Sequence, residues 1–255
     1  MSEISIDVEN VTVTYHGKVA LQSASLQLES GTICGLIGMN GAGKSTLFKA
    51  IMGFVKPTSG RILINKLPIR QVQKQNIVAY VPQSEEVDWN FPVSVHDVVM
   101  MGRYGYMNLL RIPKNHDCNV VRSSLERVEM WQMQDRQIGE LSGGQKKRTF
   151  FARALAQEST VLLLDEPFAG VDIKTEKMMI NLLIELRQKG YTILISTHDL
   201  ASIKTFCDRV VLINRTILAY GNTADVFTEE NLSRTFGGSI GDLSLTKSFL
   251  TREDR

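Results

Sequence analysis

Apolar and polar residues alternate along the first part of the chain. The alternation runs from Ile4 to Tyr15 and returns between Leu21 and Leu28. A repeat of two residues is typical of a strand that buries one face and leaves the other in solvent. These segments therefore predict an antiparallel β portion near the N-terminus.

A continuous apolar run follows, from Thr32 to Ile37, and it indicates a strand that is buried on both faces, as in the middle of a parallel sheet. Strands are predicted at Thr32–Ile37, Arg61–Asn65, Ile77–Val81, Val161–Asp165, Thr192–Ser196 and Val210–Ile213. Helical patterns lie between them, from near Lys44 to about Gly53, at Thr175–Lys189 and at Leu200–Phe206. Strands that alternate with helices favour a parallel sheet with helices on both faces.

Residues 84–158 differ from this α/β pattern because they contain few strand signals. Helical patterns appear instead at Val95–Met101, Asn119–Met130 and Gly143–Ala156. We interpret residues 84–158 as a helical lobe inserted into a single domain that covers residues 1–237. A weak helical pattern at Leu243–Leu250 belongs to a peripheral C-terminal tail, residues 238–255.

Composition limits the classes of function. With 255 residues, 43% of them hydrophobic, the chain can bury one full-sized core. A formal net charge of +2 provides no strong field for nucleic acid, so we expect no nucleic-acid partner. Three irregularly spaced cysteines without a CxxC pair predict reduced thiols. No run of 18 apolar residues exists, so work at a membrane requires another chain to cross it.

A glycine-rich loop follows the predicted strand Thr32–Ile37 and precedes a predicted helix, and it matches GxxxxGK[ST]. In this context, backbone N–H groups and the helix N-terminus cradle phosphate oxygens. Lys44 can reach the β- and γ-phosphates, and the Ser45 hydroxyl can ligate Mg²⁺. The predicted phosphate loop consists of Gly38, Met39, Asn40, Gly41, Ala42, Gly43, Lys44, Ser45 and Thr46.

Two adjacent carboxylates end the predicted buried strand Val161–Asp165. Ligands of open α/β sheets bind at the carboxyl ends of strands, so both acids should lie near the phosphate loop. Adjacent side chains on a strand point in opposite directions, which favours two separate roles. We expect Asp165 to hold Mg²⁺, directly or through water, and Glu166 to polarise the attacking water.

A second possible anion site lies at the start of the predicted helix Gly143–Ala156. Ser142 is a natural N-cap, and Gly143 and Gly144 leave the backbone N–H groups of the first turn uncovered. The tripeptide Ser142-Gly143-Gly144 by itself favours a flexible helix start over an anion site. Its neighbours distinguish these two interpretations.

The segment Leu141-Ser142-Gly143-Gly144-Gln145, followed by Lys146-Lys147-Arg148, resembles the signature sequence of ABC ATPases. The similarity extends over about residues 4–237 and implies a P-loop NTPase core. It implies that Tyr15 stacks on adenine and that Gln83 belongs to the Q-loop. It also implies that Asp172 belongs to the D-loop and that His198 is the switch histidine.

The resemblance also implies a mechanism. Two ATPase subunits would close head to tail on two ATP molecules as a homodimer. Each nucleotide would lie between the phosphate loop of one subunit and Ser142–Gln145 of the other. Glu166 would orient or deprotonate water, His198 would contact the γ-phosphate, and Gln83 would sense both Mg²⁺ and the membrane partner.

The stretch Asp88–Gly105 resembles the subfamily that imports manganese, iron or zinc. This similarity implies integral membrane permease subunits and an extracytoplasmic metal-binding protein as partners. It places the chain at the cytoplasmic face of the cell (inner) membrane, as a peripheral subunit. Trp89 and Phe91 would then grip a short helix of the partner, unless they pack within the helical lobe.

Other functions stay open from sequence alone. The chain could serve an ABC system with another cargo, such as haem, a siderophore or an exported lipid. It could also be an ABC ATPase without a transporter, although it lacks a second cassette or long coiled-coil insertion. A P-loop kinase leaves Leu141–Gln145 and His198 unexplained. Residues 116–118 (His-Asp-Cys) are not expected to bind metal, because consecutive helical residues point apart.

Overall fold

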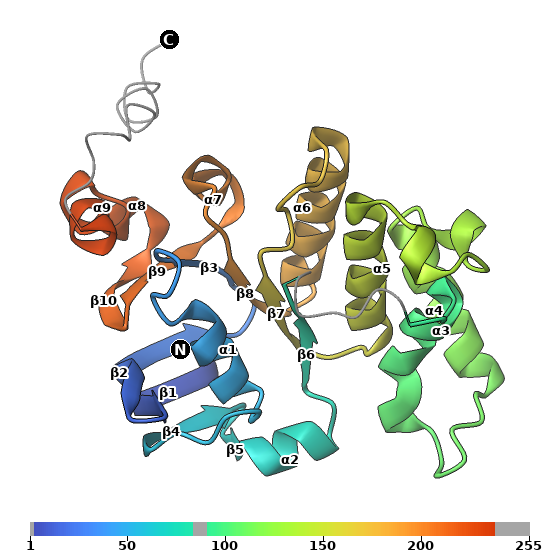
Figure 1. Ribbon diagram of the computed structural model, residues 1–255, viewed down its shortest axis with the longest axis horizontal. Helices are drawn as coiled ribbons and strands as arrows, with labels where there is room; N and C mark the ends of the chain where they lie inside the picture. The colour runs from blue at the N-terminus through green and yellow to red at the C-terminus, as the bar shows by residue number, and fades with distance from the viewer. Residues whose placement is uncertain (1–2, 84–90, 238–255) are drawn as a thin grey trace.

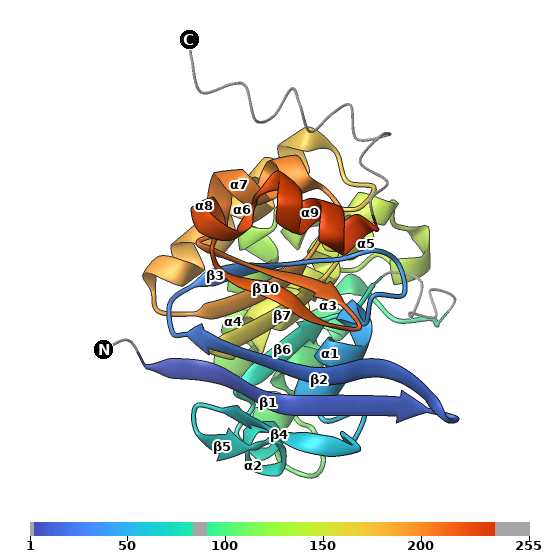
Figure 2. The same cartoon turned by 90° about the vertical axis from the view of Figure 1, so that its left-hand side faces the viewer.

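The computed structural model describes residues 3–83 and 91–237 of the chain. An antiparallel sheet with strand order β2-β1-β4-β5 forms its N-terminal layer, shown in blue and cyan in Figure 2. This confirms the antiparallel portion expected from the alternating pattern. Its strands are β1 (Ile4–Tyr15), β2 (Lys18–Glu29), β4 (Ser59–Ile64) and β5 (Leu67–Pro68).

A second sheet has strand order β10-β9-β3-β8-β7-β6. Five neighbouring strands run parallel, as predicted, but β10 pairs antiparallel with β9 at one edge. The predicted strand Arg61–Asn65 corresponds to β4 and belongs to the antiparallel sheet. The strands of the second sheet are β3 (Ile33–Ile37), β6 (Val78–Val81), β7 (Val161–Asp165), β8 (Thr192–Ser196), β9 (Arg209–Asn214) and β10 (Thr216–Asn222).

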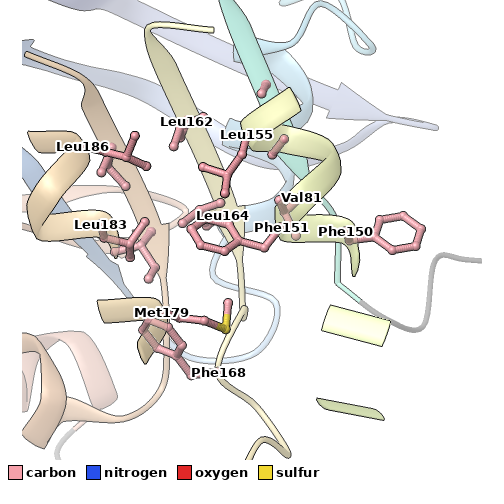
Figure 3. Close-up of a cluster of buried hydrophobic side chains, with 14 of the residues drawn as sticks. Val81, Phe150, Phe151, Leu155, Leu162, Leu164, Phe168, Met179, Leu183 and Leu186 are labelled. Atoms are coloured by element: carbon pink, nitrogen blue, oxygen red, sulfur yellow. The ribbon is translucent and has the colours of Figure 1, made fainter. Parts of the chain in front are cut away.

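The second sheet separates two hydrophobic clusters. Cys34 and Leu36 of β3 belong to the cluster shared with the antiparallel sheet and α1 (Lys44–Ile51). Ile33 and Ile37 belong to the other cluster, since successive strand residues face opposite sides. Figure 3 shows part of this second cluster. Its labelled residues include Met179, Leu183 and Leu186 of α6 (Ile173–Gln188) and Leu162 and Leu164 of β7.

Helices α6 (Ile173–Gln188) and α7 (Leu200–Phe206) follow β7 and β8, respectively. The described part of the inserted lobe, residues 91–158, contains helices and turns with one isolated β-bridge. It lies to the right of the sheet in Figure 1 and confirms the helical lobe. Its elements are α3 (Val95–Met100), η2 (Met101–Tyr106), α4 (Asn115–Arg127), η3 (Trp131–Met133), η4 (Ile138–Glu140) and α5 (Gly143–Ala156).

Helix α4 begins four residues before the predicted Asn119. The Asp117 carboxylate accepts a hydrogen bond from the backbone N–H of Lys114 at 2.9 Å. Buried Arg103 donates to the same carboxylate at 3.1 Å and to Ala156 O at 2.7 Å. The guanidinium of Arg103, in η2, therefore stabilises the start of α4. This contact leaves no mark in the local residue pattern, so the sequence did not predict where α4 begins.

The outer edge of β6 is covered by polar side chains from the end of α5 and the residues after it. Arg153 donates to Tyr80 O at 3.1 Å, and Gln157 donates to Val78 O at 2.8 Å. Ser159 donates to Asn76 O, just before the strand, at 2.6 Å. These bonds attach the helical lobe to the parallel sheet.

Several described elements have no counterpart in the predictions. They are α2 (Ile69–Lys74), β5, η3, η4, β10, α8 (Thr223–Val226) and α9 (Glu229–Phe236). The predicted helix at Leu243–Leu250 lies outside the described residues, as does Trp89. Within the described parts of the chain, no helix combines the length and apolar character that a membrane crossing requires.

Candidate functional site

The phosphate loop, residues 38–46, connects β3 to α1 and passes very close to neighbouring backbone. A Cβ atom on Gly38 would lie 2.3 Å from Ile213 O, so a side chain does not fit. Gly43 has φ +100°, and a Cβ there would lie 2.9 Å from Ala20 O. Arg215 N–H donates to Ala42 O at 2.8 Å. This hydrogen bond from the turn between β9 and β10 thus fixes the position of the loop.

A cavity of about 580 Å³ opens in front of this loop. It brings together residues from β1, β2, the phosphate loop, the end of β6 and the end of β7. Gly38 and Ala42 are buried and stand outside its lining. The lining residues are Tyr15, Ala20, Met39, Asn40, Gly41, Gly43, Lys44, Ser45, Thr46, Gln83, Asp165 and Glu166.

Lys44 is only 8% exposed. Its Nζ atom donates to Gly38 O at 2.8 Å and to Met39 O at 3.3 Å, within its own loop. Burial lowers the pKa of Lys44, whereas the nearby Glu166 and Asp165 carboxylates act in the opposite direction. The site therefore combines a partly desolvated cation with two acids, and an anionic ligand would offset the cost of that desolvation.

Ser45 and Asp165 form a pair of oxygen donors at the cavity wall. Ser45 Oγ donates to Asp165 Oδ2 at 2.9 Å, and Asp165 is only 2% exposed. Gln83, after β6, lines the same cavity and carries a side-chain amide. A hydroxyl, a carboxylate and an amide are hard donors that suit Mg²⁺. The residues present therefore fit this cation.

Glu166 follows directly after β7 and has φ +52°, a left-handed conformation that is uncommon outside glycine. Its Oε2 atom lies 2.7 Å from His198 Nδ1, beyond the end of β8. His198 stands outside the lining of the cavity, whereas Glu166 belongs to it. The two sequence-predicted residues therefore meet at the rim of the cavity. One carboxylate there can both accept from the imidazole and face a water molecule.

The signature segment, Leu141–Gln145, lies away from this cavity. Ser142 Oγ accepts from Gln145 N–H at 3.3 Å, and Gln145 Oε1 accepts from Ser142 N–H at 2.9 Å. This reciprocal capping confirms the predicted helix start of α5. Ser142 and Gly143 are exposed, and none of residues 142–145 lines the cavity. A single chain does not bring its two predicted anion sites together.

Asp172 also stands outside the cavity. It caps α6, where its carboxylate accepts from the Thr175 hydroxyl at 2.7 Å and from Thr175 N–H at 2.9 Å. These hydrogen bonds lower the pKa of Asp172. It lines a separate hollow of about 220 Å³ together with Arg148. Any contact of Asp172 with nucleotide would therefore involve a nucleotide bound by another chain.

Sequence reasoning missed several side chains around the two acids. Ser196 Oγ donates to Asp165 Oδ1, and Tyr80 OH lies 3.5 Å from Asp165 Oδ2. Lys147 donates to Glu166 O at 2.8 Å and to Ala169 O. Ser196 pairs with Asp165 in the register of β7 and β8, so a predicted strand alignment could have identified it.

Phe91, considered above for contact with a partner, and Asp117, considered for metal binding, lie outside the cavity. Phe91 is 60% exposed, so this ring does not pack within the helical lobe. Asp117 is engaged by Arg103 and Lys114. Across residues 3–83 and 91–237, no group of three or more His, Cys, Asp or Glu is arranged to hold a metal ion.

Comparisons with known proteins extend this picture. The sequence profile described as "ABC transporter" matches residues 21–169. The chain is 62% identical to the "Manganese transport system ATP-binding protein MntA" of Synechocystis sp., over 99% of this chain and 97% of that protein. It is 58% identical to the "Chelated iron transport system membrane protein YfeB" of Yersinia pestis, over 95% of this chain and 82% of that protein.

A solved structure with the same fold is described as "An inward-facing conformation of a putative metal-chelate type ABC transporter." It aligns with a TM-score of 0.80 and 30% identity, over 92% of this chain and 89% of that chain. The fold similarity thus covers both the parallel sheet and the helical lobe. The matched profile, residues 21–169, contains the phosphate loop, Gln83, the signature segment and both acids.

Proposed function

Because this chain belongs to the ABC transporter family, we propose that it hydrolyses ATP to drive import of a transition metal ion through a separate permease. One observation carries the ATPase part. A single 580 Å³ cavity gathers the phosphate loop, Gln83 and the carboxylates of Asp165 and Glu166. These residues supply the groups that bind phosphate, the ligands for a cation and a base. Phosphoryl transfer to water requires all three.

ATP would bind with its phosphates on the loop and its adenine against Tyr15, whose partly exposed ring lines the same cavity. Lys44 would exchange its loop carbonyls for the β- and γ-phosphate oxygens. Ser45, Asp165 and Gln83 would hold Mg²⁺, and the bound cation would neutralise charge that develops on the phosphates.

Glu166 is proposed to orient the attacking water and accept its proton. The His198 imidazole, 2.7 Å from Glu166 Oε2, fixes the direction of the carboxylate. His198 is itself largely exposed, so it is available to contact a γ-phosphate at the rim of the cavity. Asp165 is hydrogen-bonded to Ser45 and Ser196, whereas the Glu166 carboxylate contacts His198, so the two acids can act differently.

A second copy of the chain would complete each site. Ser142 and Gly143 are exposed at the start of α5, yet Ser142–Gln145 lie outside the cavity of their own chain. A helix N-terminus attracts anions, so the γ-phosphate of a nucleotide on a facing subunit is its natural ligand. Asp172 would lie at the same head-to-tail interface. ATP then links the two subunits, and its hydrolysis separates them.

Manganese is the first cargo we propose, with iron and zinc as the alternatives, because the relatives reported above serve manganese and chelated iron systems. Closure of the two ATPase subunits on ATP would be transmitted to the membrane permease subunits. Phe91, exposed beside the segment that follows Gln83, suits contact with a short permease helix. An extracytoplasmic metal-binding protein would deliver the ion, and this chain would act at the cytoplasmic face of the membrane.

Uptake of labelled manganese, iron and zinc tests the proposal. Cells carry either the native chain or Glu166→Gln as the only copy, and both proteins are quantified. Loss of uptake for one metal in the variant would support the importer and identify its cargo. Normal uptake of all three metals would contradict the metal assignment. It would favour another ABC cargo, such as haem, a siderophore or a lipid, or a role outside transport.

A further inference from the structure

Ser196 occupies the junction between the two acids at the end of β7. It is the last residue of β8 and is fully buried. Its hydroxyl donates to Asp165 Oδ1 and accepts from the backbone N–H of Glu166 at 3.0 Å. One oxygen therefore connects the carboxylate of the first acid to the backbone of the second.

The two carboxylate oxygens of Asp165 consequently have different hydrogen-bond partners. Oδ1 is engaged by Ser196, whereas Oδ2 is directed to Ser45 Oγ at 2.9 Å. A carboxylate on a freely rotating χ2 would sample both orientations, because this torsion is broad. A hydrogen bond to one oxygen restricts that rotation and keeps the other oxygen on the side of the cavity.

The same hydroxyl also supports the backbone at Glu166, where φ is +52°. Glu166 N–H reaches both Ser196 Oγ at 3.0 Å and Ser196 O at 3.2 Å. Two residues further along, His198 contacts the Glu166 side chain. The segment leaving β8 thus contacts both acids, through Ser196 and His198, which are two positions apart.

We propose that Ser196 is a positioning residue that turns Asp165 Oδ2 toward the cation site and fixes the backbone of Glu166. This inference rests on the ATP and Mg²⁺ site proposed above and adds a residue to it. Partners of metal ligands orient those ligands, and their removal typically weakens metal affinity about 10- to 100-fold. Ser196 acts through Asp165 and does not touch the nucleotide itself.

The test measures binding, so it does not depend on turnover. A fluorescent ATP analogue is titrated into the purified full chain, first in EDTA and then with increasing Mg²⁺. For Ser196→Ala we expect unchanged affinity in EDTA and a rise of about tenfold in the Mg²⁺ concentration that gives half of the cation-dependent signal. Ser196→Thr keeps the hydroxyl and suits a strand, so it should retain the native Mg²⁺ dependence.

Thr192→Val is the matched control, because it removes a buried hydroxyl at the opposite end of the same strand. Its Mg²⁺ dependence should equal that of the native chain. If Ser196→Ala does not fold, Ser196→Cys keeps a similar volume with a much weaker donor and should show the same direction of change. Native Mg²⁺ dependence in the folded Ala or Cys variant, or an equal shift in Thr192→Val, would overturn the inference. Absence of ATP binding by the native chain would instead overturn the proposed function.

Discussion

His198 Nδ1 lies 2.7 Å from Glu166 Oε2, although the histidine side chain is 72% exposed and that of Glu166 only 10%. The contact joins the ends of two neighbouring parallel strands, β8 and β7. The imidazole therefore reaches from the solvent side to a carboxylate that lines the cavity. This arrangement orients Glu166 without burying the histidine.

Glu166→Gln should retain ATP binding and lose hydrolysis, because the amide keeps the shape of the side chain and cannot accept the proton of water. We expect turnover to fall at least about 100-fold. The variant should accumulate as an ATP-bound dimer, which light scattering after size-exclusion chromatography detects. The mass of one chain at saturating MgATP would contradict this prediction.

Lys44→Ala should abolish detectable ATP binding. The loss expected for a buried charged contact corresponds to roughly 100-fold or more in affinity. Titration with a fluorescent ATP analogue measures it directly. Lys56→Ala is the control, since Lys56 is exposed and outside the cavity. An unchanged dissociation constant for Lys44→Ala would refute the role assigned to this cation.

Ser142→Arg, introduced together with Glu166→Gln, should leave ATP binding to the single chain unchanged and prevent the ATP-bound dimer. Ser142 lies outside the cavity of its own chain, so its substitution affects only a nucleotide held by a facing subunit. Binding titration and light scattering separate these two effects. A drop in the affinity of the single chain equal to that of Lys44→Ala would show that the signature segment acts within one subunit.

Gly38→Ala should reduce the free energy of unfolding by about 1–3 kcal/mol, because the added methyl group would overlap Ile213 O. Urea denaturation of the native chain and the variant measures the difference. Gly143→Ala serves as a control, since nothing lies within 4 Å of a Cβ atom at that position. Equal destabilisation by both substitutions would contradict the steric explanation.

Asp117→Asn should lower the melting temperature at neutral pH, with a difference that shrinks in acid. A hydrogen bond from the Lys114 backbone, together with Arg103, holds the pKa of Asp117 below its usual range. A carboxyl with a depressed pKa stabilises the fold above its ordinary pKa, and this contribution is lost as the pH falls through the lowered value.

The melting temperatures of native and Asp117→Asn chains should therefore converge below about pH 4. Thermal unfolding followed by circular dichroism between neutral and acidic pH checks the convergence. Asp135→Asn, an exposed change in the same lobe, is the comparison. A constant difference across the whole pH range would mean that packing of the introduced amide, and not the lost charge, accounts for the change.

The sequence predicted much of the fold because local signals agreed with tertiary structure. Helix α5 has the bounds expected from its N-cap Ser142, and β7 has those expected from an apolar run that ends in acids. Strand β10 was missed because its turn is made at Arg215, with φ +58°, in place of a glycine or asparagine. A turn of that kind leaves no mark in the residue pattern.

The site residues also divide into those that the sequence predicted and those that it missed. The phosphate loop, Asp165 and Glu166 were expected together, since the carboxyl ends of parallel strands meet at one edge. Gln83 was expected only from the resemblance to ABC ATPases. Ser196 was missed because a serine that ends an apolar run has no distinctive local pattern. Its role depends on strand register, which pairs it with Asp165 from 31 positions away. Only the folded chain brings these two side chains into contact.

The bonds between α5 and β6 also have a consequence for solubility. Strand β6 ends the parallel sheet, and the carbonyls of Val78 and Tyr80 face outward from it. An uncovered edge of this kind is a template on which a strand of another molecule can add. Gln157 and Arg153 donate hydrogen bonds to those carbonyls. The inserted lobe therefore protects the ATPase core from edge-to-edge aggregation before the chain assembles with its partners.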